Sequence, residues 1–131
     1  MTPETQNHWT VLLVEDEPVI RSLIRNLLKR CQCDVLEAGS GEEALAVCEQ
    51  HDGPIHLLVA DVKLPGILGP EVATRVRALR PDVRVLHISG SPYLGSEPII
   101  YKPFKVPELI GKVLELLQGN DPTPKSRSDW A

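Results

Sequence analysis

A run of four apolar residues near the amino terminus, Val11–Val14, places the strongest limit on the fold of this chain. A strand with one face in water alternates apolar with polar residues, whereas a continuous apolar run predicts a strand buried on both faces. Such strands occur in parallel sheets that helices cover on both sides. The run ends abruptly in the acidic segment 15–17. We therefore expect an α/β fold with charged side chains directly beyond a buried strand.

The rest of the chain alternates between strand and helix patterns. Four further strands are predicted, at residues 34–38, 55–60, 83–88 and 99–101. Proline suits the first turn of a helix, and Ser40 with Glu43 forms a capping-box pattern. Helices are accordingly predicted to begin near Pro18, Ser40, Pro70 and Pro107. This alternation predicts one doubly wound parallel sheet with helices on both faces.

The composition fits one soluble domain. A length of 131 residues leaves little room for a second domain, and 42% hydrophobic residues suffice for a core. The net charge of −4 argues against a nucleic-acid-binding surface. An odd number of cysteines, no signal peptide and no run of ~20 apolar residues predict a cytoplasmic protein without a membrane segment. We place the domain at residues 10–118, between an amino-terminal tail (1–9) and a mobile carboxy-terminal tail (119–131).

Candidate functional residues lie where the predicted strands end. Glu15 and Asp16 follow the first strand, Asp61 the third, Ser89 the fourth and Lys102 the fifth. In an open parallel sheet the carboxyl ends of the strands meet at one edge, where ligands bind. We therefore expect these five side chains to form one site.

The residue types at this edge indicate phosphoryl chemistry. Three carboxylates repel one another unless a cation compensates, and Mg²⁺ prefers carboxylate oxygens together with water and a phosphoryl oxygen. Lys102 and Ser89 can neutralise and hydrogen-bond the oxygens of a transferring phosphoryl group. The sequence has no glycine-rich phosphate loop, which disfavours a nucleotide ligand. A carboxylate beside a metal and a lysine can instead form an acyl phosphate on itself. We therefore expect that this protein itself becomes phosphorylated and that it is not an enzyme that processes metabolites.

These motifs resemble the receiver domain of response regulators over residues 10–118. The matching segments, in chain order, are Glu15-Asp16, Asp61 with Leu64-Pro65-Gly66 and Gly69, Ser89-Gly90, and Lys102-Pro103-Phe104. The resemblance implies a flavodoxin-like, five-stranded sheet in the order 2-1-3-4-5. It also implies transfer of a phosphoryl group to Asp61 from a histidine of a partner kinase or phosphotransfer protein, in a two-component or phosphorelay system.

The resemblance further implies a role for each site residue. Asp16, Asp61 and the main-chain carbonyl of Lys63 would bind Mg²⁺, with Glu15 assisting through water. Ser89 would move to bond the phosphoryl group, and Lys102 would pair with it. Lys102-Pro103 is expected to be a cis peptide bond, a form that X-Pro bonds tolerate. The only chemistry that the protein itself would perform is self-phosphorylation from a phosphodonor and self-dephosphorylation. Because the tail is too short for a DNA-binding module, we expect the signal to pass to a separate protein.

The segment 90–98 departs from the family pattern. It holds two glycines and two prolines in a span too short for the usual crossover helix. We therefore expect the helix between the fourth and fifth strands to be absent or reduced to a loop. The aromatic switch residue of the family stands three positions before the lysine, where this chain has Ile99, whereas Tyr101 is next to Lys102.

Two alternatives follow from the missing helix. The uncovered side of the fourth and fifth strands, with Tyr93 and Leu94, is predicted to be a surface that binds a partner or a second copy of the chain. Self-association would form a homodimer through the edge of these two strands. Alternatively, the loop folds down so that Leu94 and Ile99 fill the gap in a monomer. The function could also be that of an interaction module that works without phosphorylation. The missing helix favours that function, whereas the intact acids and Lys102 favour a phosphorylation switch.

Overall fold

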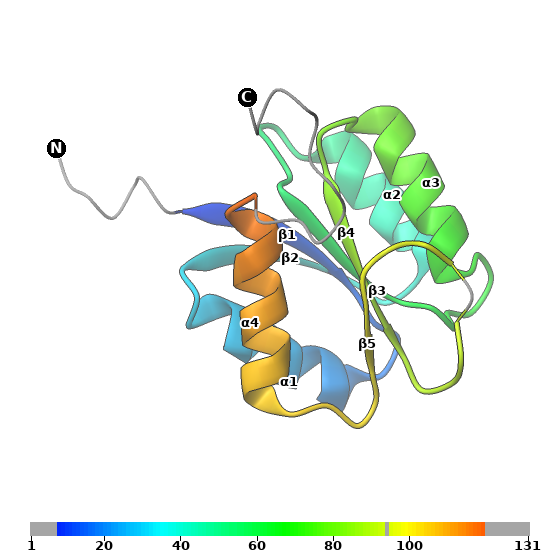
Figure 1. Cartoon of the computed structure of the whole chain (residues 1–131). Coiled ribbons are helices and arrows are strands. Elements are labelled where there is room, and N and C mark those ends of the chain that lie inside the picture. The colour runs from blue at the N-terminus through cyan, green and yellow to red at the C-terminus, as the bar shows by residue number, and fades with distance from the viewer. Residues whose placement is uncertain (1–7, 94, 120–131) are drawn as a thin grey trace, which may run out of the picture.

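The computed structural model describes residues 8–93 and 95–119, and its centre is a five-stranded parallel sheet (Figure 1). The strand order is β2-β1-β3-β4-β5, as the resemblance implied. The strands are β1 (Trp9–Val14), β2 (Cys33–Ala38), β3 (Leu57–Asp61), β4 (Arg84–Ser89) and β5 (Ile99–Tyr101). Every pair of neighbouring strands is parallel, so all carboxyl ends lie at one edge.

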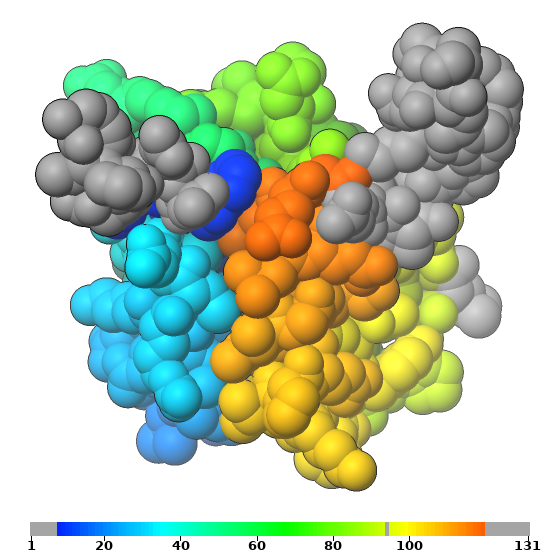
Figure 2. Space-filling model, turned by 60° about the vertical axis from the view of Figure 1, so that its left-hand side comes forward, coloured from blue at the N-terminus to red at the C-terminus, as the bar shows by residue number. Residues whose placement is uncertain are grey.

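Four helices in the described residues form two layers, one on each face of the sheet (Figure 1). One layer contains α1 (Pro18–Lys29) and α4 (Val106–Leu117), which lie side by side in Figure 2 as the blue and orange segments. The other layer contains α2 (Gly41–Gln50) and α3 (Gly69–Leu79). Each layer closes its own hydrophobic core against the sheet.

The apolar run in β1 supplies both cores. Val11 and Leu13 belong to the core under α1 and α4, whereas Leu12 and Val14 belong to the core under α2 and α3. All four side chains are fully buried. Because successive side chains of a strand point to opposite faces, an alternating sequence would have put polar groups into one of these cores.

The helix starts follow the sequence signals, with one difference. The Ser40 hydroxyl accepts a hydrogen bond from the Glu43 N–H at 3.1 Å, as a capping box requires. The Glu43 carboxylate, however, accepts from the N–H of Gly39 and not from that of Ser40. The cap therefore includes the last residue before Ser40, and it closes the connection between β2 and α2.

Two strands run one residue further than predicted, and both extra residues are site residues. Asp61 is the last residue of β3 because it pairs with Ile88, and Ser89 is the last residue of β4 because it pairs with Tyr101. The sheet pleat therefore fixes the backbone of both. Strand β3 begins at Leu57 and not at residue 55, so the buried Ile55 lies in the connection before it.

The predicted absence of a helix between β4 and β5 is confirmed, since residues 90–93 and 95–98 form only bends and irregular backbone. The side chain of Tyr93 packs against His87 of β4 and partly covers this half of the sheet. Ile99 is half-buried and Tyr101 is exposed, while the predicted gap-filler Leu94 lies outside the described residues. Self-association through this edge stays a prediction.

Most of the two predicted tails, 1–9 and 119–131, also lies outside the described residues. Trp9, the final residue of the first, begins β1 and packs against the core under α1 and α4. In the part of the chain that the structure describes, no helix has the length and apolar character that crossing a membrane requires.

Candidate functional site

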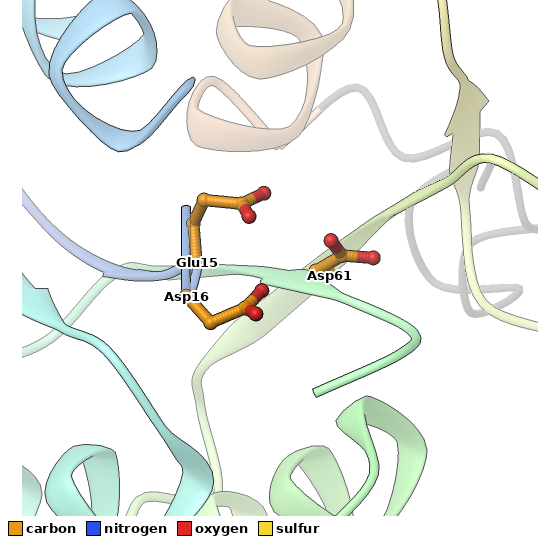
Figure 3. A group of neighbouring side chains, drawn as sticks. All are labelled: Glu15, Asp16 and Asp61. Atoms are coloured by element: carbon orange, nitrogen blue, oxygen red, sulfur yellow. The ribbon is translucent and has the colours of Figure 1, made fainter. Parts of the chain in front are cut away.

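Three carboxylates converge at the carboxyl edge of the sheet (Figure 3). Glu15 and Asp16 follow β1 directly, and Asp61 ends β3, the strand next to it. One oxygen from each carboxylate lies within 4.8 Å of the others. Glu15 and Asp61 are buried, whereas Asp16 is exposed. The cluster is therefore rooted in the core and open to solvent on one side.

Main-chain groups orient the two buried carboxylates. The Glu17 N–H donates to Oε2 of Glu15 at 3.1 Å, and the Lys63 N–H donates to Oδ1 of Asp61 at 3.2 Å. Each bond runs from the residue two positions later, so the turn after each strand fixes the carboxylate that precedes it. The guanidinium of Arg21 holds the first turn in place by donating to the Glu15 carbonyl oxygen at 2.8 Å.

The loop after Asp61 closes tightly against the end of β3. The N–H of Gly69, the first residue of α3, donates to the Val62 carbonyl oxygen at 2.9 Å. A Cβ atom on Gly69 would lie only 2.2 Å from the Asp61 carbonyl oxygen. Glycine is therefore required here for a close approach between two backbone segments.

Lys102 supplies the positive charge of the site. Its Nζ lies 2.7 Å from Oδ2 of Asp61 and 3.4 Å from Oε1 of Glu15. The Lys102 N–H donates to the carbonyl oxygen of Ser89 at 2.7 Å, which continues the pairing of β5 with β4. The bond between Lys102 and Pro103 is cis, as predicted.

The charges of these groups depend on one another. Burial raises the pKa of Glu15, and the hydrogen bond from the Glu17 N–H partly offsets this rise. The negative charge of Asp61 raises the pKa of Glu15 further. Burial lowers the pKa of Lys102, but the hydrogen bond and charge of Asp61, with a contribution from Glu15, outweigh it and raise that pKa overall. Lys102 is therefore firmly protonated, and the site holds a fixed cation between two acids.

Ser89 lies at the same edge but is turned toward the loop that follows it. Its side chain is fully buried. The hydroxyl donates to the Ser91 carbonyl oxygen at 2.6 Å and accepts from the Ser91 N–H at 3.2 Å. The structure thus brings Glu15, Asp16, Asp61 and Lys102 together, whereas the Ser89 hydroxyl is hydrogen-bonded to the neighbouring loop.

Comparison with known proteins identifies the arrangement. The sequence model of the response regulator receiver domain family matches residues 11–114. This chain belongs to that family. The receiver domain is 33% identical over 121 residues to Sensor kinase CckA of Brucella abortus (strain 2308), covering 86% of this chain and 13% of that protein. It thus corresponds to a small part of that relative, and the expectation that no output domain is fused to it stays a prediction.

Solved structures agree with this assignment. The receiver domain from the hybrid histidine kinase CckA superposes with a TM-score of 0.75 at 38% identity, covering 83% of this chain and 99% of that one. A CheY-like receiver domain protein from Methanospirillum hungatei JF-1 gives a TM-score of 0.77 at 26% identity, covering 84% and 94%. The fold and the family are therefore established together.

Sequence reasoning missed three features of this receiver domain. His87 is fully buried two residues before Ser89. Gly69 was part of the family pattern, but its close approach to the Asp61 carbonyl oxygen was not predicted. An apolar groove also lies next to the site, lined by Ile20, Leu23, Lys102, Pro103 and Phe104. The high apolar content of the segment 19–24 signalled the first helix, but the groove forms only when the loop before α4 is brought against it.

Proposed function

We propose that Asp61 is the phosphoacceptor of a two-component or phosphorelay system. The observation that carries this proposal is the position of its carboxylate, buried at a strand end, 2.7 Å from the Lys102 ammonium and beside two further acids. Transfer breaks the bond between phosphorus and the donor nitrogen and forms a bond between phosphorus and an Asp61 oxygen. The donor histidine keeps the electron pair and takes up a proton from water.

The donor set also supports a Mg²⁺ site. Carboxylate oxygens are the ligands that this hard cation prefers, and opposite ligands of Mg²⁺ lie about 4.2 Å apart. The three carboxylates lie within 4.8 Å of one another, which is close to that separation. The proposed arrangement has direct bonds from Asp16 and Asp61, with Glu15 reached through water. The carbonyl of Lys63 is the proposed main-chain ligand. Bound Mg²⁺ would supply positive charge for the phosphoryl oxygens.

Lys102 and Ser89 complete the proposed chemistry. Once Asp61 carries a phosphoryl group, the Lys102 ammonium pairs with a phosphoryl oxygen, which preserves its contact with this part of the site. The Ser89 hydroxyl releases Ser91 and donates to a second oxygen. Such donors stabilise charge that develops during phosphoryl transfer.

The proposed phosphodonor is a histidine of a kinase or phosphotransfer protein. The groove beside Lys102 gives such a protein an apolar contact next to the acceptor, because Leu23 is 46% exposed and the neighbouring Val19 is 76% exposed. Exposed apolar side chains that cluster near a reactive group are typical of a protein contact. The proposed downstream partner is a separate protein that distinguishes the phosphorylated state.

The main alternative remains an interaction module that works without phosphorylation. It is favoured by the loop that replaces a helix between β4 and β5. That function needs no ammonium group between two buried acids, and keeping such a charge cluster folded is costly. The retained cluster therefore favours phosphorylation.

Substituting Asp61 with asparagine is expected to abolish phosphorylation. Incubation of the unchanged protein with acetyl phosphate and Mg²⁺ should add the mass of one phosphoryl group, measured on the intact protein. Asp61→Asn removes the nucleophilic oxygen while keeping the size of the side chain, so no mass should be added. Omitting Mg²⁺ should greatly reduce the product.

Asp52→Asn is the matched control, because Asp52 is an exposed acid in the loop after α2. It should be phosphorylated like the unchanged protein. Equal phosphorylation of the Asp61 variant would show that another residue is the acceptor. No phosphorylation of the unchanged protein, with beryllofluoride also failing to bind, would favour the interaction module.

Mg²⁺ is expected to raise the melting temperature, because a ligand that binds only the folded state stabilises it by mass action. At a concentration 100 times the dissociation constant the gain is about 2.7 kcal/mol. Asp16→Ala should reduce this response severalfold in a thermal unfolding experiment at several Mg²⁺ concentrations. Glu49→Ala removes an exposed acid from α2 and should leave the response intact. An undiminished response in Asp16→Ala would exclude Asp16 as a ligand.

A further inference from the structure

The histidine of β4 is buried beneath a tyrosine of the following loop. His87 is fully buried, and its Nδ1 lies 3.1 Å from the Ala60 carbonyl oxygen, directly before the phosphoacceptor. Among the described side chains, its Nε2 is the buried polar atom that lacks a hydrogen-bond partner. The ring of Tyr93 packs on this imidazole, with centroids 5.3 Å apart and planes inclined by 60°. Tyr93 therefore covers a polar group that links β4 to the end of β3.

The position of Tyr93 is fixed from the loop side as well. A Cβ atom on Gly95 would lie 1.9 Å from the Tyr93 hydroxyl oxygen, so the phenol passes directly over that glycine. Burial and the nearby charge of the Glu97 carboxylate raise the pKa of Tyr93, so that carboxylate lies close to the same hydroxyl. The Glu97 carboxylate in turn forms a two-point ion pair with Arg77 of α3, at 2.5 and 2.7 Å. Tyr93 thus contacts β4 through its ring, and its hydroxyl lies close to a residue that is ion-paired with α3.

The same loop also holds the Ser89 hydroxyl. Ser89 lies two residues after His87 in β4, so both side chains point to the same face of the sheet. Ser91, which accepts the hydrogen of Ser89, lies two residues before Tyr93. A hydroxyl carries one hydrogen and can donate it once. Ser89 therefore cannot donate to Ser91 and to a phosphoryl oxygen on Asp61 at the same time.

We propose that Tyr93 is the aromatic positioning residue of this receiver domain, and that its packing on His87 holds Ser91 where it retains the Ser89 hydroxyl. This inference rests on the proposed phosphorylation of Asp61 and describes how that phosphorylation is regulated. Tyr93 acts from the loop, whereas the strand position three residues before Lys102 is occupied by Ile99 and the adjacent Tyr101 is 46% exposed. Coupling between two events is reciprocal. A phosphoryl group on Asp61 that draws the Ser89 hydroxyl away from Ser91 weakens the packing of Tyr93 on His87. Conversely, loss of the Tyr93 ring makes binding of such a group to Asp61 more favourable.

The test measures the affinity for beryllofluoride, which takes the place of the phosphoryl group on the Asp61 carboxylate, at saturating Mg²⁺. Tyr93→Ala is expected to bind at least about fivefold more tightly than the unchanged protein, the lower end of common coupling strengths. Tyr93→Phe keeps the ring on His87 and should stay within about twofold. Tyr101→Ala, the matched aromatic control, should also stay within about twofold. Tyr93 is half-buried on a loop, and circular dichroism checks that each variant is folded.

A second measurement follows the aromatic signals of Tyr93 and His87 by nuclear magnetic resonance. Both should shift when beryllofluoride binds to the unchanged protein. Unchanged or weaker binding by Tyr93→Ala, or a larger effect in Tyr101→Ala, would overturn the role of Tyr93, as would stationary Tyr93 signals. If the unchanged protein binds no beryllofluoride, or Asp61→Asn binds it equally well, the phosphorylation proposal itself fails, so the two failures are distinguishable.

Discussion

Gly69→Ala is expected to lower the free energy of unfolding by about 2–3 kcal/mol, the usual cost of forcing a methyl group into closely packed surroundings. The added Cβ would lie 2.2 Å from the Asp61 carbonyl oxygen and 3.0 Å from both the Asp61 carbonyl carbon and the Val62 Cα. These neighbours are backbone atoms and cannot rotate aside. The end of β3 must shift, and the phosphoacceptor moves with it. Beryllofluoride binding should therefore be lost as well.

Gly111→Ala provides a matched control for this experiment. Gly111 lies inside α4, and a Cβ there meets no atom within 4 Å. Alanine is a better helix former than glycine by about 0.8–1 kcal/mol, so this variant should be more stable than the unchanged protein. Urea unfolding of both variants gives the comparison. A Gly69 variant as stable as the unchanged protein, with full ligand binding, would show that the loop after β3 yields easily.

Lys102→Met is expected to lower the free energy of unfolding by about 2–3 kcal/mol and to slow phosphorylation about 100-fold. Methionine keeps most of the chain length but removes the cation between Asp61 and Glu15, which are 8% and 2% exposed at their side chains. Breaking a buried pair leaves uncompensated charge, and the partial exposure of Lys102 limits the cost. Chemical unfolding and intact-mass kinetics with acetyl phosphate measure the two effects.

The stability loss in this variant should depend on pH. Burial already raises the pKa of Glu15, and loss of the ammonium group raises that pKa further. The folded variant then binds protons more readily than its unfolded chain, so the deficit should shrink as the pH falls from 7 toward 5. Lys29→Met, at the exposed end of α1, should show neither effect. A deficit that grows with acid would argue against unpaired carboxylates as its cause.

The sheet and the four acidic and basic site residues could be predicted because their signals are local. The residues of Val11–Val14 are all apolar because they serve two cores in turn, and this alone indicates helices on both faces. Glu15, Asp16, Asp61 and Lys102 each stand at the end of a strand pattern. Parallel topology then gathers strand ends without any knowledge of side-chain packing. The glycine and proline content of the segment 90–98 likewise sufficed to predict that no helix forms there.

The remaining features depend on contacts between segments, which local sequence patterns do not reveal. The apolar pattern of β4 is interrupted at His87, but only the folded loop shows that Tyr93 covers this ring. Gly69 belongs to the family pattern, but the reason for a glycine there, the close approach of two backbone segments, appears only in the fold. The hydrogen-bond partner of the Ser89 hydroxyl could not be predicted either, because a hydroxyl can rotate. It could point toward Asp61 or toward the loop that follows β4.

Strand β5 is only three residues long and pairs with β4 alone, at the edge of the sheet. Edge segments with few backbone hydrogen bonds open locally at a small fraction of the free energy needed to unfold a whole domain. Lys102 follows this strand directly, whereas Asp61 ends β3, which is buried along its full length. The negative and positive halves of the site thus belong to units of different local stability. Transient opening of β5 can withdraw the ammonium group from Asp61 while the acidic half of the site remains intact.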